Sequence, residues 1–380
     1  MSLLAALPFA TALAAAPPVS PAVAAHAVAP QWSSDGARVA WELTAPACSR
    51  VALYIYDERA DRLGRVQVGG GMGRIAPVDP DRPPDPCASA GAAATRGFST
   101  AARADATQAL AWAPDAPDAG FGTFAFSGSD ATSDLDLYVQ SGPAGARIEG
   151  GPGADSDPRW VPGAARRVIF TSARTGSGDL YLADLDQGQV TRLTDAPRTT
   201  ELYAAPSPDG SAVAYVAHDH EGDHIWLRPD LAAGTPSRRL TDWRGLQVRP
   251  AWRPDGGALA FYANRDDPAR FDLYVLALPD GTPKRLLTGV HLDATGPAWT
   301  PDGRALVVVQ ADDDQFNPVA RIDATTGAAS AVPTGTVGNG DLDLVTGVDG
   351  RTWLAISALG RDGDAVREYR RIYTMALPAP

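Results

Sequence analysis

The sequence is poor in cysteine and lacks the linear motifs of the common enzyme classes. Only Cys48 and Cys87 occur among 380 residues, and no Cys-x-x-Cys pair is present. A zinc ribbon or a thioredoxin-type redox centre is therefore excluded. There is also no phosphate-binding loop, no Rossmann glycine fingerprint, no His-Glu-x-x-His and no Gly-x-Ser-x-Gly. A site assembled from separate segments of the chain remains open.

Clusters of positive charge are missing as well. The formal net charge is -12, from 45 acidic and 33 basic residues, and no basic run interrupts the acidic background. A surface of this sign repels phosphate backbones and anionic lipid headgroups. We therefore expect neither nucleic acid nor an anionic membrane as a partner.

Long apolar segments are confined to the N-terminus. The first 16 residues are mostly apolar, and Ala22-Val23-Ala24 and Ala25-His26-Ala27 are small-x-small cleavage sites. This pattern is typical of a secretory signal peptide, although its first part has no Lys or Arg. The run is too short to span a bilayer, and no later segment is longer. We expect a signal peptide over residues 1–27, a periplasmic or secreted chain starting near Ala25 or Val28, and no transmembrane segment in that chain. An Ala/Pro-rich tail, or a start codon assigned too far downstream, is the alternative.

A short segment related to Trp-x-Pro-Asp-Gly recurs along the chain. The last six copies begin 46 to 48 residues apart, and 80 residues separate the first two, which indicates one repeat plus an insertion. Units of about 40–50 residues are typical of the blades of a β-propeller. The seven copies are Trp32-Ser33-Ser34-Asp35-Gly36, Trp112-Ala113-Pro114-Asp115, Trp160-Val161-Pro162-Gly163, Pro206-Ser207-Pro208-Asp209-Gly210, Trp252-Arg253-Pro254-Asp255-Gly256, Trp299-Thr300-Pro301-Asp302-Gly303 and Thr346-Gly347-Val348-Asp349-Gly350.

Each repeat reads as four short strands separated by turns. Pro-Asp-Gly is turn chemistry, because proline presets φ, aspartate bonds its own backbone and glycine accepts positive φ. The sequence predicts an all-β propeller of seven blades, each with four antiparallel strands, as one domain over residues 28–380 with a Pro/Gly-rich insertion at about 69–106. Six blades is the alternative. The last repeat, over residues 341–376, has no obvious fourth strand, and residues 18–27 are placed to supply one.

The repeat resembles that of the TolB family. The pattern Pro-x-Trp-Ser-Pro-Asp-Gly, Ile-Ala-Phe, Asp-Ile-Tyr, Arg-Leu-Thr is matched best at 158–194, 206–241 and 250–288, and more loosely over 28–376. The resemblance implies a propeller, without the α/β domain that precedes it in TolB itself. Similar propellers precede the hydrolase domain of prolyl oligopeptidase-like enzymes, and oligogalacturonate lyases use scattered metal ligands on a similar repeat.

One face of such a ring is expected to carry the function. The Pro-Asp-Gly turns share the far face, whereas the loops between second and third strands and those between blades share the near face. The near face has the chemically varied segments, including three of the five histidines. The predicted binding residues are His218, Asp219, His220, Glu221, Asp223, His224, Asp266, Asp267, Asp293, Glu201, Tyr203 and Arg249.

These residues support more than one function. We expect a non-enzymatic protein that binds an envelope protein or a glycan through the near face, with no cofactor and no catalytic residues assigned. Imidazole and carboxylate groups in one loop can also bind a divalent cation, so a metal-dependent lyase or hydrolase with a central site is one alternative. A degenerate propeller once associated with a peptidase is another.

The two cysteines are predicted to form one disulfide. Cys48 falls in the loop between the second and third strands of the first repeat, and Cys87 falls in the Pro-rich insertion. Both segments are expected on the near face, and a bridge would anchor an insertion that has little apolar content of its own. Two free thiols are the alternative, and would fit a cytosolic protein.

Overall fold

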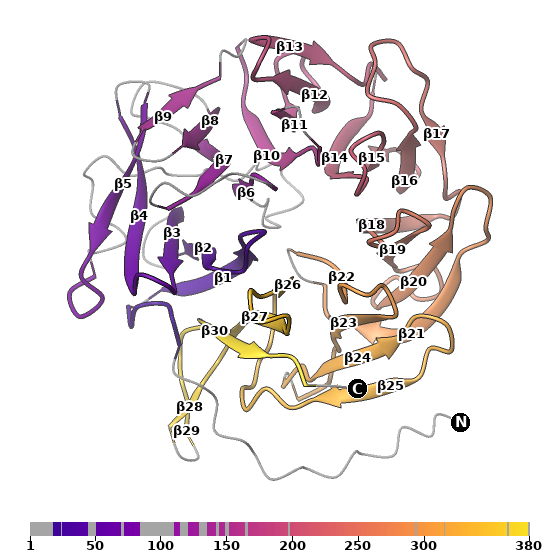
Figure 1. Ribbon diagram of the computed structural model, residues 1–380. Helices are drawn as coiled ribbons and strands as arrows, with labels where there is room; N and C mark the ends of the chain where they lie inside the picture. Colours follow the sequence, from indigo (N-terminus) through magenta and orange to yellow (C-terminus); the bar gives the residue numbers. More distant parts are fainter. Residues whose placement is uncertain are drawn as a thin grey trace.

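The computed structural model consists of β-strands arranged in a ring (Figure 1). No helix occurs in the described part of the chain, and small antiparallel sheets follow one another around the ring. The prediction of an all-β fold is confirmed. The described residues are 18–23, 25–44, 51–69, 72–83, 110–114, 121–128, 135–141, 144–148, 152–163, 166–196, 198–292, 295–314, 316–362 and 365–378.

Three sheets form the first half of the ring, and in each of them the strands pair in chain order. The first sheet has five strands, because residues at the start of the predicted insertion form β5. Its strands are β1 (His26–Trp32), β2 (Arg38–Thr44), β3 (Val51–Asp57), β4 (Arg62–Gly69) and β5 (Met72–Val78). The second comprises β6 (Leu110–Trp112), β7 (Thr123–Gly128), β8 (Asp136–Ser141) and β9 (Ala144–Arg147). The third comprises β10 (Asp155–Trp160), β11 (Arg167–Ser172), β12 (Asp179–Asp184) and β13 (Gln189–Arg192).

The second half contains two meanders joined into one eight-stranded sheet. A short parallel pairing of β16 with β18, at Gly222–Gly245 and Asp223–Leu246, joins them. The meanders are β14 (Thr200–Pro206), β15 (Val213–Asp219), β16 (Gly222–Arg228) and β17 (Arg238–Arg239), then β18 (Gly245–Trp252), β19 (Ala258–Ala263), β20 (Phe271–Ala277) and β21 (Lys284–Val290). Next come β22 (Ala298–Trp299), β23 (Ala305–Val309), β24 (Val319–Asp323) and β25 (Ala329–Val332), and last β26 (Leu342–Thr346), β27 (Thr352–Ala358) and β30 (Arg371–Ala376), with the hairpin β28 (Arg361–Asp362) and β29 (Ala365–Val366) between β27 and β30.

The core lies between neighbouring sheets rather than inside any one of them. The second strands are buried along nearly their whole length, as β19 and β23 show, because each sheet is covered on both sides by its neighbours. Such strands become continuous apolar runs in the sequence instead of alternating ones. The cluster around Phe261 and Tyr274 accordingly extends from Ala214 on β15 to Ile322 on β24.

The Pro-Asp-Gly turns fix the contacts between sheets on the far face. In the turn after β14, the Ser207 hydroxyl donates to Asp209, and the Gly210 N–H donates to the Ser207 carbonyl at 2.9 Å. Gly210 has φ +69°, and a Cβ there would lie 1.9 Å from the Pro162 carbonyl oxygen of the preceding sheet. This glycine therefore serves both the turn and the close approach of the neighbouring sheet.

The repeat tryptophans link consecutive inner strands. The Trp112, Trp252 and Trp299 indole N–H groups donate to carbonyl oxygens in the inner strand of the preceding repeat, at 3.2, 2.7 and 3.1 Å. The acceptors occupy equivalent positions, one residue before the repeat tryptophan or its counterpart, and are Gln31, Ala205 and Ala251. A large ring with one donor thus joins neighbouring sheets by packing and by a hydrogen bond.

The Leu-Thr ending of the fourth strand forms a second link. The Thr194 hydroxyl accepts from the Leu180 N–H at 2.8 Å and donates to Glu201 in the next sheet at 3.1 Å. Thr241 repeats the arrangement one sheet later, between Ile225 and Gln247. The threonine of Arg-Leu-Thr therefore holds the end of its own sheet against the start of the next.

The ring closes between the first residues described and the last sheet. The Val19 N–H donates to the Ile372 carbonyl at 2.9 Å, and the Ile372 N–H donates to the Ser20 hydroxyl at 3.0 Å. Val19 thus lies along the outer edge of β30, which has no other strand beside it in the described sheet. Ala25 and Ala27 are fully buried in the core shared by the first and last sheets.

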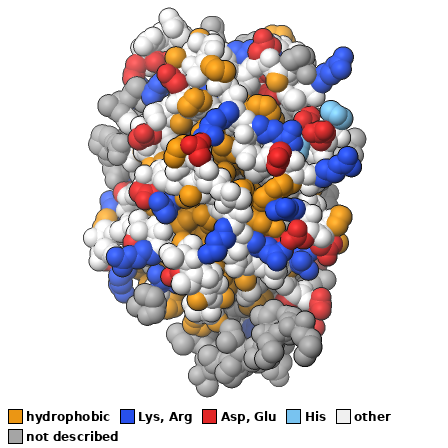
Figure 2. Space-filling view, turned by 90° about the vertical axis from the view of Figure 1, so that its right-hand side faces the viewer, with side chains coloured by type: hydrophobic (Ala, Val, Ile, Leu, Met, Phe, Trp, Pro, Cys, Tyr) orange, Lys and Arg blue, Asp and Glu red, His pale blue; other side chains and the backbone are white. Residues whose placement is uncertain are grey.

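The outer side of the ring around β17 and β21 carries charges of both signs. Figure 2 shows acidic and basic side chains interspersed on this side, with apolar side chains between them. No single-sign patch is visible on this side. Cys48 and Cys87 lie outside the described residues, so the predicted disulfide stays a prediction.

Candidate functional site

The histidine-rich segment is a tight β-hairpin on the near face. The sequence predicts a loop from His218 to His224, but β15 and β16 continue into it and pair up to Asp219 and Gly222. The turn is held by the Glu221 N–H, which donates to Asp219 Oδ1 at 2.7 Å. Gly222 is required at its end, because a Cβ there would lie 2.2 Å from the carbonyl oxygen of Gly245, at the start of β18.

The three histidines of this hairpin have different surroundings. The His218 side chain is 51% exposed, and its Nδ1 lies 2.6 Å from the fully buried Asp223 carboxylate. His220 is exposed at the turn. His224 is 1% exposed, and its Nδ1 lies 3.0 Å from Gln247 Oε1. His224 and Asp223 therefore support the hairpin, whereas His218 and His220 present imidazoles to solvent.

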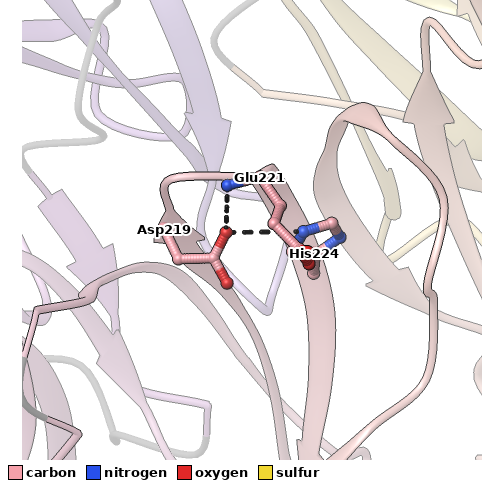
Figure 3. A group of neighbouring side chains, drawn as sticks. All are labelled: Asp219, Glu221 and His224. Atoms are coloured by element: carbon pink, nitrogen blue, oxygen red, sulfur yellow. Dashed lines mark hydrogen bonds and ion pairs between the residues drawn. The ribbon is translucent and has the colours of Figure 1, made fainter.

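One group on the hairpin has the composition of a metal site. Ligand atoms of Asp219, Glu221 and His224 all lie within 4.8 Å of one another (Figure 3). The Arg239 guanidinium already lies among them, with Nη2 within 3.0 Å of both His224 ring nitrogens and Nη1 3.4 Å from Glu221. Burial opposes the ionised form of Asp219, but the Glu221 N–H and the nearby His224 and Arg239 hold the pKa of its carboxyl below the ordinary value. The arrangement fits an ion-pair cluster better than a metal ion.

The second meander of the same sheet, β18 to β21, contributes an aromatic and ionic surface with the loop that precedes it. The Trp243 ring packs 5.0 Å from Tyr274 and is covered by the Arg265 guanidinium at 4.4 Å. Asp266 pairs with Arg285, and Asp267 Oδ1 accepts the Ala269 N–H at 3.0 Å. The Trp243 carbonyl also accepts from Gln247, the residue that contacts His224, so this surface continues into the hairpin. Asp293 lies outside the described residues.

Glu201 is buried between two sheets and does not face solvent. It is 1% exposed and accepts hydrogen bonds from the Thr199 and Thr194 hydroxyls. Burial raises the pKa of its carboxyl to about 7, the nearby Asp179 adds to the rise, and the two threonines oppose it. Its position in the fold is that of a link between sheets.

Tyr203 and Arg249 lie in the centre of the ring, away from the hairpin. Each sits three residues before the repeat tryptophan or its counterpart, in a β-bulge of the inner strand, with φ of +53° and +58°. Ala29 and Asp157 occupy the same position in two other sheets, also with positive φ. Bulges of this kind redirect side chains locally. Four inner strands, β1, β10, β14 and β18, thus present one residue each in a common backbone conformation, and the residue type differs from strand to strand.

Two cavities adjoin in the centre of the ring. The smaller, about 170 Å³, is lined by Arg159, Tyr203, Arg249 and Thr295 among others. The larger, about 380 Å³, shares Arg159 and Thr295 with it and is otherwise lined mainly by the tryptophans at the ends of β1, β6 and β10 and by prolines near them. Asp343, on the wall of the larger cavity, accepts the Trp32 N–H at 2.7 Å, and burial raises the pKa of its carboxyl to about 7.

The repeat and the ring have counterparts among known proteins. Residues 197–359 match the family described as the TolB beta propeller domain. A TolB homologue of Chlorobaculum tepidum is 30% identical over 93 residues, or 24% of this chain and 20% of that protein. In this part the chain is similar to TolB β-propellers.

Other known proteins share the repeat or the fold. The Tol-Pal system protein TolB of Alcanivorax borkumensis is 29% identical over 113 residues, covering 28% of this chain and 25% of that one. The puromycin-hydrolyzing peptidase of Mycobacterium tuberculosis has a similar fold, with a TM-score of 0.62 at 14% identity over 96% of this chain and 54% of that one. The chain spans only about a fifth to a third of the TolB proteins it matches. No helix of the described residues is long and apolar enough to cross a membrane.

Arg159 is a central residue that the sequence pattern did not reveal. Arg159 was not among the predicted binding residues, although it lines both cavities with Tyr203, Arg249 and Thr295 nearby. It stands one residue before the repeat tryptophan, and no motif marks that position. A comparison of the bulge and its neighbours across all repeats is the signal that would have found it.

The buried Glu201 makes the stability of the propeller depend on pH. Its pKa is about 7 when folded, against about 4.3 in an unfolded chain, so folding favours the protonated form. The stabilisation is full below pH 4.3 and is lost as pH rises towards 7. We expect the free energy of unfolding of the wild type, measured in urea, to fall from pH 5 to pH 8 as Glu201 ionises. In Glu201→Gln this fall should be smaller than in the wild type by about 2–3 kcal/mol.

A matched variant separates this effect from general titration. Asp280→Asn removes a carboxyl that is 87% exposed and should keep the wild-type slope. Equal slopes for Glu201→Gln and the wild type would show that Glu201 titrates normally in the folded protein.

Proposed function

We propose that this TolB-like propeller is an exported, non-enzymatic binding protein of the periplasm or the extracellular space. Its near face would hold an envelope protein or a glycan, and its acidic surface disfavours nucleic acid. Support for the compartment comes from the apolar N-terminus, together with the TolB resemblance.

The near-face surface carries this proposal. We define it as His218, His220, Glu221, Trp243, Arg265 and Asp266. The side chains of His218, Glu221, Arg265 and Asp266 are 47–53% exposed, and Trp243 is held by Phe261 and Tyr274 beneath it. An anchored indole under an arginine, with hydrogen-bonding groups around it, is the composition of protein-binding hot spots, and the indole also suits sugar stacking.

The number of blades is also part of what we propose. We infer seven, of which the last consists of β26, β27 and β30 with Val19 along its outer edge. The eight-stranded sheet counts as two blades, because each of its meanders has its own inner strand with a bulge. Six blades would require two of these units to share one inner strand.

A metal-dependent lyase or hydrolase is the second candidate. The specific observation in its favour is the group of Asp219, Glu221 and His224 (Figure 3). Stoichiometric binding of Zn²⁺ or Mn²⁺ that is lost in Asp219→Asn would support it. Arg239 among the three side chains weighs against it, since a guanidinium and a divalent cation repel each other.

Photo-cross-linking tests the near-face assignment directly. A photoreactive phenylalanine at His220, exposed on the near face, should give a discrete adduct in envelope extract or with envelope glycan. The matched site is Val348, which is 80% exposed in a far-face turn and should give none. Adducts from position 348 alone, or from neither position, would contradict the proposal.

A further inference from the structure

A groove on the far face lies between the two meanders of the eight-stranded sheet. At the near-face end the meanders are joined, because the first two residues of β16 pair with the first two of β18. Both strands are described in full, and their pairing ends there. Further along, Leu227 of β16 and Trp252 of β18 line a space of about 550 Å³, together with the Pro-Asp-Gly turns at Pro208 and Pro254. The groove therefore forms where the two meanders diverge.

Two hydrogen bonds hold the walls of this groove in place. On the inner side, the Trp252 indole N–H donates to the Ala205 carbonyl of β14 at 2.7 Å. On the outer side, Arg238 Nη2 of β17 donates to the Pro279 carbonyl, in the loop after β20, at 2.7 Å. Each bond joins one meander to the other. The groove is thus formed before a ligand arrives, and a preformed site avoids part of the ordering cost of binding.

The floor and the walls of the groove are largely apolar. Trp252 is partly exposed, whereas the repeat tryptophans Trp160 and Trp299 are each 8% exposed. The space beside Gly256, which also lines the groove, is open, because a Cβ there would have no atom within 4 Å. Three prolines add apolar surface, and they are Pro208, Pro254 and Pro279. An indole between such walls suits a ligand that has an apolar face of its own.

Two carboxylates on the rim keep acceptor oxygens available. Asp209 Oδ1 accepts from the Ser207 and Ser211 hydroxyls, and Asp255 Oδ1 accepts from the Arg253 guanidinium at 2.7 Å. The bonds from Ser207 and Arg253 hold the pKa of these two carboxyls below the ordinary value, so both are ionised at neutral pH. Within the described part of the chain, Oδ2 of either carboxylate accepts no hydrogen bond. Their lone pairs therefore remain for a donor on a ligand.

Charges of both signs border the groove, and this disfavours a ligand of a single sign. Asp255 is paired with Arg253, and Arg238 lies 3.9 Å from Asp280. A cation at Asp209 would also meet the positive field of Arg238, and an anion would meet both rim carboxylates. A hydroxyl can donate to a carboxylate and accept from a guanidinium, and Arg238 has five N–H donors, of which its protein contacts use only part. Sugars combine such hydroxyls with an apolar C–H face.

We propose that the far-face groove binds a neutral oligosaccharide, with one sugar ring packed on Trp252 and with hydroxyls that donate to Asp209 and accept from Arg238. The volume of about 550 Å³ lies in the usual range of small-molecule sites, about 300–1,000 Å³. The site is on the opposite face from the near-face surface and goes beyond the proposed function, so either can fail without the other.

Calorimetric titration of the full chain with small probes tests the groove. The neutral probes are cellotriose, maltotriose and triacetylchitotriose, and the charged ones are trigalacturonate and the peptide trilysine. We expect at least one neutral probe to bind with a dissociation constant in the millimolar range or below, and at least tenfold more tightly than either charged probe. Failure of all the neutral probes, or a charged probe that binds within tenfold of the best neutral one, would overturn the proposal.

Substitutions then locate the binding. Asp209→Asn puts an amide donor in place of the available acceptor oxygen and should weaken the sugar at least threefold. Asp302→Asn, in the equivalent turn two repeats later, is the matched control and should change nothing. Trp252→Ala should weaken the sugar at least tenfold. Because that indole also packs in the core, Arg238→Gln, at a side chain that is 44% exposed, is the independent test, with an expected loss of at least threefold. Unchanged binding by Asp209→Asn or Arg238→Gln, or a loss in Asp302→Asn, would place the sugar elsewhere and overturn the proposal.

Discussion

Gly210→Ala is expected to destabilise the propeller by about 2–5 kcal/mol. The residue has φ +69°, and an alanine in this left-handed region costs about 1–2 kcal/mol. A Cβ would in addition meet the Pro162 carbonyl oxygen at 1.9 Å, so the two neighbouring sheets would have to separate locally. Overpacking of this kind typically costs a further 1–3 kcal/mol. Urea unfolding followed by tryptophan fluorescence measures the loss.

The chain provides a matched control one repeat later. Gly256 occupies the equivalent turn position with φ +74°, but nothing lies within 4 Å of its Cβ position. Gly256→Ala should therefore lose only the backbone part, about 1–2 kcal/mol. Equal losses at the two positions would mean that the contact with Pro162 carries no energy.

This pair of glycines shows what the repeat sequence can and cannot predict about the structure. The sequence predicts the turn at both positions, because Pro-Asp-Gly specifies the local backbone. It cannot predict which glycine touches the neighbouring sheet, since that depends on how two sheets pack. For the same reason the repeat predicted the ring of sheets but not which neighbouring strand each tryptophan contacts. The indole bonds to the preceding inner strand became visible only in three dimensions.

In the candidate site, too, the sequence predicted local features but not how neighbouring strands pack. The histidine segment lies on the near face, but His224 is buried, because β16 pairs with β15 on one side and with β18 on the other. Asp223 and His224 are both covered there, so their burial depends on how neighbouring strands pack and not on the residues of the hairpin alone. Tyr203 and Arg249 were grouped with the hairpin because both lie near junctions between repeats. An inner-strand bulge places them in the centre instead, and a bulge leaves no consistent residue type in the sequence.

Removal of residues 1–27 is expected to destabilise the propeller by on the order of 5 kcal/mol, whereas removal of residues 1–17 should change little. The longer deletion removes Val19, Val23, Ala25 and Ala27 from the core between the first and last sheets. Burial of these side chains is worth about 1–2 kcal/mol for each valine and less for each alanine. Arg371 would lose the Ala25 and Val23 carbonyl oxygens, at 2.8 and 2.7 Å, and its buried guanidinium would keep fewer acceptors.

Thermal and urea unfolding of the two shortened chains decides this prediction, and it bears on the proposed export. A chain starting at Pro18 keeps the bond from the Val19 N–H to the Ile372 carbonyl and should melt within a few degrees of the full chain. If a leader is cleaved during export, we expect the cut to precede Val19, because a cut near Ala25 or Val28 would leave the outer edge of β30 bare. Exposed edges of this kind promote pairing with other chains, so the shorter protein should also aggregate. Equal stability of the two shortened chains would mean that residues 18–27 do not close the ring, and a native N-terminus at Val28 would agree with that outcome.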